Sequence, residues 1–263
     1  MKAKANDIEI NYEVHGSEGA PWLVLSHSLA CSVRMWDPQI EAFKGRYRIL
    51  AYDMRGHGAT SAPQGPYTLD LLADDVLELM KALKIPRATW IGLSIGGMIG
   101  QTLALRGATP FDAMVLADTT HTQPPEAIKQ WEERIRIAQT QGMKALVPST
   151  MERWFTEPFR GRPEAQKIAA LIAATPVAGF VGCGQAIMKL NTTARLKDIK
   201  LPVLAITGES DGAAAGTKHI GQAIPGAKFV SIPHASHIAN VEQPEAFTRA
   251  LREFLSSLPS GRA

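Results

Sequence analysis

Short apolar runs rich in β-branched residues alternate along the chain with longer stretches in which apolar residues recur at helical spacing. The strand-like runs lie at residues 8–14, 22–27, 47–53, 88–94, 113–118, 202–207 and 228–233. After the third run, one apolar face follows a helical period at Leu69, Leu72, Val76, Leu79 and Leu83. Asn6 and Asp7 predict a turn from a further short strand at the start of the chain. We therefore expect a mostly parallel, eight-stranded sheet flanked by helices.

The stretch between residues 122 and 190 carries a different pattern. It contains no strand-like run, and four segments punctuated by Pro and Gly have helical spacing: "PPEAIKQWEERIRIAQTQG", "MKALVPSTMERWF", "PEAQKIAALIAA" and "GFVGCGQAIMKLN". The later strand-like runs are needed to complete the sheet, so this stretch interrupts one domain. We predict a core made of residues 1–121 and 191–263 and a helical cap made of residues 122–190.

Composition and charge narrow the class of partner. The chain has 263 residues, and its 28 basic and 25 acidic side chains are scattered and leave a formal net charge of +3. This balance offers no basic surface for nucleic acid or a membrane, so a small molecule is the expected partner. The N-terminus turns polar early and no run reaches about 18 apolar residues, so we expect a cytoplasmic protein. The sequence leaves the oligomeric state open.

The two cysteines, Cys31 and Cys183, lie far apart in the sequence. This spacing favours free thiols over a disulfide framework and lacks the pairing of a cysteine zinc site. His234 and His237 also have no acidic or thiol ligand at a suitable spacing, which disfavours a metal site at this pair. We expect no metal and no cofactor.

The segment "IGLSIGGMIG" at residues 91–100 presents Ser94 between a strand-like run and a helical one. A Gly-x-Ser-x-Gly sequence at a strand-to-helix turn is typical of a nucleophilic serine, because the glycines let backbones approach closely. Two other glycine-rich sites are excluded. Gly97 is followed by Met98 rather than by the Lys of a phosphate loop, and the Gly-x-Gly-x-x-Gly of a dinucleotide turn is absent here. Ser94 is therefore the candidate nucleophile.

A serine hydroxyl needs an imidazole to take its proton and a carboxylate to orient that imidazole. His234 and His237 both follow the last strand-like run, in "IPHASHIANVEQPEAF". For the acid, Asp211 follows the penultimate run and Asp118 ends the run before it. The order Ser94, Asp211, His237 is the chain order of the triad in α/β-hydrolases.

A tetrahedral intermediate on Ser94 also needs two backbone N–H donors for its oxyanion. Ile95, directly after the nucleophile, is expected to supply one donor. Leu29, in the turn "HSLACS" after the second strand-like run, is the expected second donor. His27 in the same turn is interpreted as a polar residue that holds the loop.

Segments spread over nearly the whole chain resemble the α/β-hydrolase superfamily: "LSHSL", "YDMRGHGATSAP", "GLSIGG", "LADTT", "GESDG" and "SHIANVEQPEAF". Others are similar to the 3-oxoadipate enol-lactonases of aromatic catabolism within it: "LVLSHSLACSVRMWDPQ", "GPYTLDLLADDVLELMKALKI", "RWFTEPFR" and "GFVGCGQAIMKLN". The resemblance implies the α/β-hydrolase fold with a cap insert. It also favours His237 over His234 as the base and Asp211 over Asp118 as the acid.

The resemblance has departures in the predicted oxyanion loop. His27 stands where the lactonases usually have Asn, and Ala30 stands where they have Gly. The segment "DMRGHG", with Asp53, Arg55 and His57, resembles a structural motif of the superfamily, and we assign it no catalytic step. The departures bear on substrate fit rather than on the chemistry.

The candidate residues and the resemblance indicate a cofactor-free serine hydrolase that opens a small lactone or ester through an acyl-enzyme. A carboxylate-bearing enol-lactone is the expected substrate. The alternatives are a broad carboxylesterase, a C–C bond hydrolase with the same triad, and a small-molecule binding protein built on the same fold.

A substrate carboxylate needs a cation near the pocket, and an Arg fork suits it better than a Lys. The cap supplies five arginines: Arg134, Arg136, Arg153, Arg160 and Arg162. Arg134 and Arg153 lie beside Trp131 and Trp154 in the sequence. We predict these four residues as substrate contacts, although large aromatics in a helical insert usually pack in its core.

Overall fold

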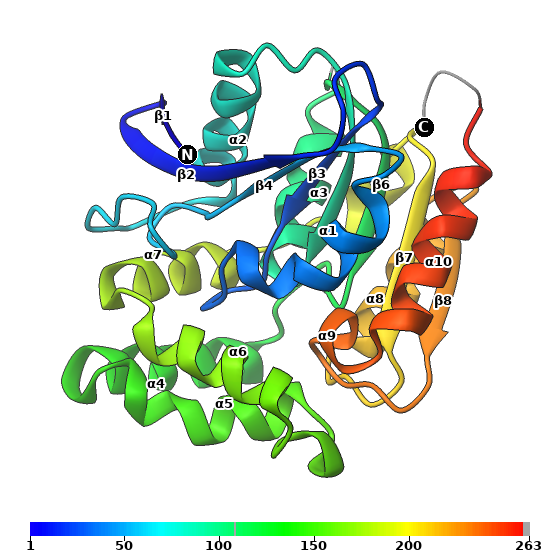
Figure 1. Ribbon diagram of the computed structural model, residues 1–263. Coiled ribbons are helices and arrows are strands. Elements are labelled where there is room, and N and C mark those ends of the chain that lie inside the picture. The colour runs from blue at the N-terminus through cyan, green and yellow to red at the C-terminus, as the bar shows by residue number, and fades with distance from the viewer. Residues whose placement is uncertain (108, 260–263) are drawn as a thin grey trace.

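An eight-stranded sheet forms the centre of the computed structural model, which describes residues 1–107 and 109–259 (Figure 1). Its strands are β1 (Lys2–Ala5), β2 (Ile8–His15), β3 (Trp22–Ser26), β4 (Arg48–Tyr52), β5 (Ala88–Leu93), β6 (Phe111–Ala117), β7 (Val203–Gly208) and β8 (Lys228–Ile232). They lie in the order β1-β2-β4-β3-β5-β6-β7-β8. β2 pairs antiparallel with β1 and β4, and every other pair is parallel. The predicted mostly parallel sheet of eight strands is confirmed.

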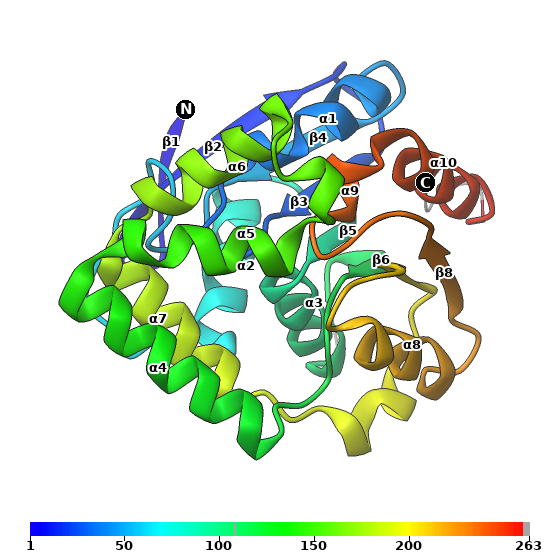
Figure 2. The same ribbon diagram turned by 90° about the horizontal axis from the view of Figure 1, so that it is seen from below.

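Helices cover both faces of the sheet, as Figure 2 shows. On one face, α1 (Asp37–Phe43) contacts α10 (Pro244–Ser256). On the other face lie α2 (Leu69–Ala82), α3 (Ile95–Leu105) and α8 (Ala214–Ala223). Because the sheet is covered on both sides, every residue of β5, β6 and β7 is buried, as parallel strands require.

The helix α2 shows how the apolar pattern directs packing. Thr68 caps its start, because the Thr68 hydroxyl accepts a hydrogen bond from the Leu71 N–H. Leu72, Val76 and Leu79, three of the residues that predicted the helix, are buried. The periodic face therefore fixes which side of α2 meets the rest of the core.

Residues 123–190 form a group of helices that lies below the sheet in Figure 1. They are α4 (Pro125–Gln141), α5 (Val147–Trp154), α6 (Pro163–Ala174) and α7 (Val177–Met188). An isolated antiparallel bridge between Thr122 and Asn191 closes the base of the group, next to the predicted limits of the cap at residues 122 and 190. The segment "MKALVPSTMERWF" is not one helix: a 3-10 turn at Met143–Leu146 precedes α5, whose first turn contains Pro148. Pro148 has no backbone N–H to donate to the preceding turn, so it is tolerated only in the first turn of a helix and separates the two.

The two cysteines are part of the packed interior. Cys31 and Cys183 are buried free thiols, and burial raises the pKa of each. Within residues 1–107 and 109–259, no single helix is both long enough and apolar enough to cross a membrane. The helices α6 and α7 reach that length and apolarity only as a pair, and the pair is bent by 97° at its break.

Candidate active site

Ser94 occupies the sharp turn between β5 and α3. Its backbone has φ 58° and ψ −114°, a conformation that residues other than glycine rarely adopt. Glycines make the turn sterically possible: a Cβ atom on Gly92 would lie 2.2 Å from the Gly96 oxygen, and one on Gly96 would lie 2.4 Å from the Ser26 oxygen. The turn thus presents the Ser94 hydroxyl beyond the carboxyl end of β5.

His237 lies between Ser94 and Asp211. Its Nε2 is 3.0 Å from the Ser94 Oγ, and its Nδ1 is 3.0 Å from the Asp211 Oδ1. Asp211 comes from the loop after β7 and His237 from the loop between β8 and α9 (Ala239–Glu242). Three loops at the carboxyl edge of the sheet therefore bring together a hydroxyl, an imidazole and a carboxylate. In this order an imidazole can take the serine proton while the carboxylate orients the ring.

The two alternative residues have different surroundings. His234 is exposed, and its carbonyl group accepts a hydrogen bond from the Gln243 side chain. Asp118 is fully buried, and its Oδ1 accepts a hydrogen bond from the Gly208 N–H at 2.7 Å.

In the part of the chain that the structure describes, no three His, Cys, Asp or Glu side chains are grouped to hold a metal ion. The residues that contact His237 through its ring nitrogens are Ser94 and Asp211.

Leu29 and Ile95, the predicted oxyanion donors, come from different elements. Leu29 belongs to the loop after β3 and lines the same cavity as Ser94, and Ile95 is the first residue of α3. Within residues 1–107 and 109–259, neither backbone N–H has a hydrogen-bond partner. Both donors are therefore available to an oxygen atom at Ser94.

Two buried imidazoles hold the loop that carries Leu29. The Ala30 N–H donates to the His57 Nε2 at 2.9 Å, and the Met54 N–H donates to the His27 Nε2 at the same distance. Burial lowers the pKa of His27 and lowers that of His57 to about 3, so both rings are neutral and accept through Nε2. This agrees with the interpretation of His27 as a structural residue. The sequence did not reveal His57 as the support of Ala30, because the two are far apart along the chain.

A cavity of about 820 Å³ extends from Ser94 to the cap. All four predicted substrate contacts line it: Trp131, Arg134, Arg153 and Trp154. The Trp154 ring also packs against the His237 ring, with their centroids 5.7 Å apart. The cap therefore forms one wall of the site.

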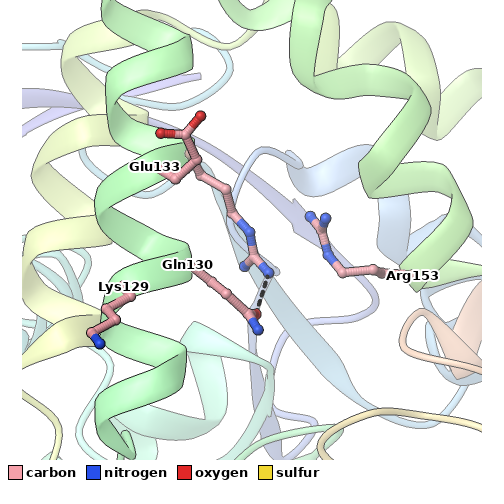
Figure 3. Close-up of a pocket in the computed structure, with 5 residues that line it drawn as sticks. Lys129, Gln130, Glu133 and Arg153 are labelled. Carbon is pink, nitrogen blue, oxygen red and sulfur yellow. Dashed lines mark hydrogen bonds between the residues drawn. The ribbon is translucent and has the colours of Figure 1, made fainter.

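Arg134 and Arg153 are cations without an acidic partner in this wall. Arg134 donates to the Gln130 Oε1 at 3.2 Å, the dashed line in Figure 3, and Arg153 donates to the Thr150 hydroxyl at 3.2 Å. Among the described residues, neither forms a salt bridge. Burial and the charge of Arg153 lower the pKa of Arg134 to about 10, which leaves it charged at neutral pH. Burial also lowers the pKa of Arg153, and the nearby Glu152 acts in the opposite direction.

A second hollow of about 470 Å³ adjoins the two arginines. Its lining residues are Lys129, Gln130, Glu133, Arg134 and Arg153. Figure 3 shows Gln130 on α4 and Arg153 on α5 pointing toward the space between these helices. Since Gln130 and both arginines also line the main cavity, the arginines lie between the two spaces. Two neighbouring guanidinium groups without a carboxylate are suited to bind an anion.

Glu242 ties the cap to the loop that carries His237. Its Oε1 accepts from the Thr156 N–H at 2.9 Å, and its Oε2 accepts from the Ser236 N–H at 2.8 Å. The Ser236 hydroxyl in turn donates to the Arg153 carbonyl oxygen at 3.0 Å. Glu242 was not predicted from the sequence. It is the one acidic residue in "IANVEQP", and nothing in its neighbours indicates that its side chain is buried.

Comparisons with known proteins agree with this architecture. Residues 21–244 match the family model described as the alpha/beta hydrolase fold. The chain is 36% identical over 255 residues to 3-oxoadipate enol-lactonase 2 of Acinetobacter baylyi. The alignment covers 94% of this chain and 93% of the relative. Among solved structures, the enol-lactonase from Burkholderia xenovorans LB400 superposes with a TM-score of 0.93 at 39% identity, covering 98% of this chain and 100% of the other. A malate-bound thermophilic esterase from Thermogutta terrifontis superposes with a TM-score of 0.90 at 26% identity, covering 97% of each chain.

Proposed function

The chain belongs to the α/β-hydrolase family, and from this premise we propose that it is a serine hydrolase that opens small lactones bearing a free carboxylate. One observation carries the proposal: the two ring nitrogens of His237 lie 3.0 Å from the Ser94 Oγ and 3.0 Å from the Asp211 Oδ1. This is the arrangement that lets an imidazole activate a serine hydroxyl.

In the proposed reaction, the Ser94 Oγ attacks the lactone carbonyl carbon while its proton passes to the His237 Nε2. The Leu29 and Ile95 N–H groups hold the oxyanion of the tetrahedral intermediate. Collapse of this intermediate breaks the ring C–O bond, and the proton on His237 passes to the leaving oxygen. A water molecule, deprotonated by the His237 Nε2, then attacks the acyl carbon. The bond to the Ser94 Oγ breaks as His237 returns the proton to that oxygen, and the open acid is released.

The substrate class follows from the cap wall. Arg134 is half-buried and Arg153 is exposed, and neither has a carboxylate partner in the described residues, so both can bind a ligand anion. The names of the relatives support the same chemistry, because two are enol-lactonases and one esterase binds malate, a dicarboxylate. We place the substrate carboxylate at the arginines, the scissile carbonyl at Ser94 and the substrate body along Trp131 and Trp154. Within this class, a 3-oxoadipate enol-lactone of aromatic catabolism is the expected substrate.

A broad carboxylesterase is the second candidate. A cavity of about 820 Å³ is much larger than a small lactone, and it would accept longer acyl or alcohol groups. The same Ser94, His237 and Asp211 would act on such esters, so the two candidates differ only in what the cap selects.

The experiment is a hydrolysis panel with the purified protein and its Ser94→Ala variant. The panel contains an anionic enol-lactone, a neutral lactone of the same ring size, and p-nitrophenyl acetate. We expect the anionic lactone to have the highest kcat/KM. Ser94→Ala should lower turnover of every substrate by about 10⁴-fold while circular dichroism shows an unchanged fold, because the three residues act as a unit.

Three outcomes would contradict this reading. A variant that retains a tenth of wild-type turnover would remove Ser94 from the mechanism. A preference for p-nitrophenyl acetate over both lactones would support the carboxylesterase. Saturable ligand binding without turnover of any substrate would indicate a binding protein.

A further inference from the structure

Asp118 is a second carboxyl group at the active site, beside the one that contacts His237. It directly follows β6, whereas Asp211 lies on the loop after the neighbouring strand β7, and both residues line the cavity. Gly208 links them: its N–H donates to the Asp118 Oδ1 at 2.7 Å, and its carbonyl oxygen accepts from the Asp211 N–H at 3.2 Å. The backbone of Asp118 has φ 44°, in the left-handed region that strained residues at functional sites often occupy.

Each of these two acids has one carboxyl oxygen without a donor. Within residues 1–107 and 109–259, the Oδ2 of Asp118 and the Oδ2 of Asp211 are both buried and have no hydrogen-bond partner. Buried polar atoms are usually satisfied, and an unpartnered carboxylate oxygen is costly. A single proton shared between the Oδ2 atoms of Asp118 and Asp211 would give both buried oxygens a hydrogen-bond partner.

We propose that Asp118 is a positioning residue that stays protonated and donates a hydrogen bond from its Oδ2 to the Asp211 Oδ2. The pair then carries one negative charge, on Asp211, which orients His237 through its other oxygen. Asp118 touches neither His237 nor the substrate in this arrangement and acts through Asp211. The inference rests on the proposed function, because it assumes that Asp211 orients the base.

The groups around Asp118 agree with a neutral acid. Burial and the negative charge of Asp211 raise the pKa of Asp118 well above its usual range. The Gly208 N–H, the Thr207 hydroxyl and the Ala239 N–H act in the opposite direction, and none of them bonds to the Oδ2. Asp211 is itself the next titratable group along the network, followed by His237.

The first test compares Asp118→Asn with Asp118→Leu. An asparagine keeps the acceptor for the Gly208 N–H and replaces the acid proton by a permanent N–H donor, whereas leucine has similar volume and no donor. We expect kcat/KM of Asp118→Asn to stay within about threefold of wild type, with its acid limb at the same pH, because a neutral group replaces a neutral group. We expect Asp118→Leu to lower kcat at least about tenfold with little change in KM, because Asp211 loses its donor.

Two kinetic results would overturn the proposal. One is an Asp118→Asn variant as impaired as Asp118→Leu, which would mean that the amide cannot replace the acid. The other is an acid limb displaced to lower pH by about one unit or more, which would show that a negative charge next to His237 has been removed. A residue that only fills space would tolerate leucine as well as asparagine, so a wild-type kcat in Asp118→Leu would also overturn the proposal.

A second measurement is independent of activity. A carboxyl group whose pKa is raised by folding stabilises the protein below about pH 4, and this contribution is lost as the pH rises through the folded pKa. The difference in urea midpoint between Asp118→Asn and wild type should therefore grow in favour of the variant from about pH 4 upward and then level off. A difference that stays constant over this range would overturn the proposal.

The two measurements separate this inference from the proposed function. If Ser94→Ala remains active, the serine mechanism fails, and the urea midpoints still report whether Asp118 is protonated. If Ser94→Ala is inactive and the midpoint difference does not depend on pH, the mechanism stands and the role of Asp118 is wrong.

Discussion

The polar side chains at the carboxyl edge of the sheet and those in the inner wall of the cap differ in how fully protein partners hold them. At the sheet edge, Ser94, His237 and Asp211 hold one another at hydrogen-bond distance, and Ser94 is fixed further by its N–H bond to the Ala117 carbonyl oxygen at 2.8 Å. In the cap wall, Arg134 and Arg153 each make one hydrogen bond to an uncharged side chain. The three groups proposed to react are therefore preorganised by the fold, whereas the two arginines proposed to bind the substrate have hydrogen-bond donors left for a ligand.

Glu242 joins the two regions. Its carboxylate holds Thr156 of the cap and Ser236 of the loop that carries His237, and the backbone of Ile238 also donates to the Trp154 carbonyl oxygen at 3.3 Å. The loop of His237, the proposed base, is thus attached to the cap as well as to the sheet. A ligand held by Arg153 would bind next to the segment that positions His237.

The largest expected effect tests the preorganised region. His237→Ala should lower kcat by about 10⁴-fold on both anionic and neutral substrates, because no other base reaches Ser94 in the described residues. The matched control is His234→Ala, three residues away and exposed, which should leave kcat within about twofold because surface substitutions are usually neutral. Both variants are measured in the same ester and lactone assays.

A reversed ranking of these two variants would assign the base to His234. It would also remove the contrast between the two regions, because an exposed loop residue rather than the hydrogen-bonded network would then take the proton of Ser94.

The preorganised region could largely be predicted from the sequence. Strand, Gly-x-Ser-x-Gly and helix follow one another within a few residues, and the backbone turn at Ser94 is a local consequence of Gly92 and Gly96. Position after a strand limited the acid to Asp211 or Asp118 and the base to His237 or His234, and the resemblance to α/β-hydrolases favoured Asp211 and His237. The support of the loop that carries Leu29 could not be predicted, because the contact between His57 and Ala30 depends on how distant loops fold together.

The helices of the cap could be predicted from the sequence, but the side chains that line the cavity could not. Arg134 and Arg136 are two residues apart on α4, so their side chains point to opposite sides of the helix. Arg134 lines the cavity, while Arg136 is exposed and paired with Glu133. The packing of α4 against the rest of the cap decides which arginine faces the cavity, and the local sequence does not determine that packing.

The next effect in size tests recognition in the cap wall. Arg134→Ala and Arg153→Ala should each raise KM for the anionic enol-lactone by an amount equivalent to about 1.5–3 kcal/mol, the range of a charge-assisted hydrogen bond. Turnover of p-nitrophenyl acetate should hardly change, because it has no carboxylate. The matched control is Arg136→Ala on the same helix, which should affect neither substrate because Arg136 is exposed and paired with Glu133.

Equal losses of kcat/KM on the anionic and the neutral substrate would show that the arginines support the fold of the cap rather than the ligand. No loss on either substrate would place the carboxylate elsewhere. Either result would move the substrate assignment toward the carboxylesterase.

The smallest effect tests whether the preorganised region carries strain. Ala30, which stands where the lactonases usually have Gly, has φ 56° and is buried in the loop that presents Leu29. A left-handed conformation costs a residue with a Cβ atom about 1–2 kcal/mol, and glycine avoids this cost while losing about 0.4–1 kcal/mol through its freer unfolded chain. Ala30→Gly should therefore raise the free energy of unfolding by about 0.5–1 kcal/mol, measured by urea denaturation.

The control for this substitution is Ala51→Gly, at a buried position inside β4. There the backbone is regular strand, so glycine should lower the unfolding free energy by about 0.5–1 kcal/mol instead. Opposite signs for two alanine-to-glycine changes would identify strain at Ala30 as the cause, since the lost methyl group is the same in both. If both changes destabilise the protein, the contacts of the Ala30 methyl group in the cavity wall outweigh the strain, and the methyl group itself would then shape the space next to the Leu29 N–H.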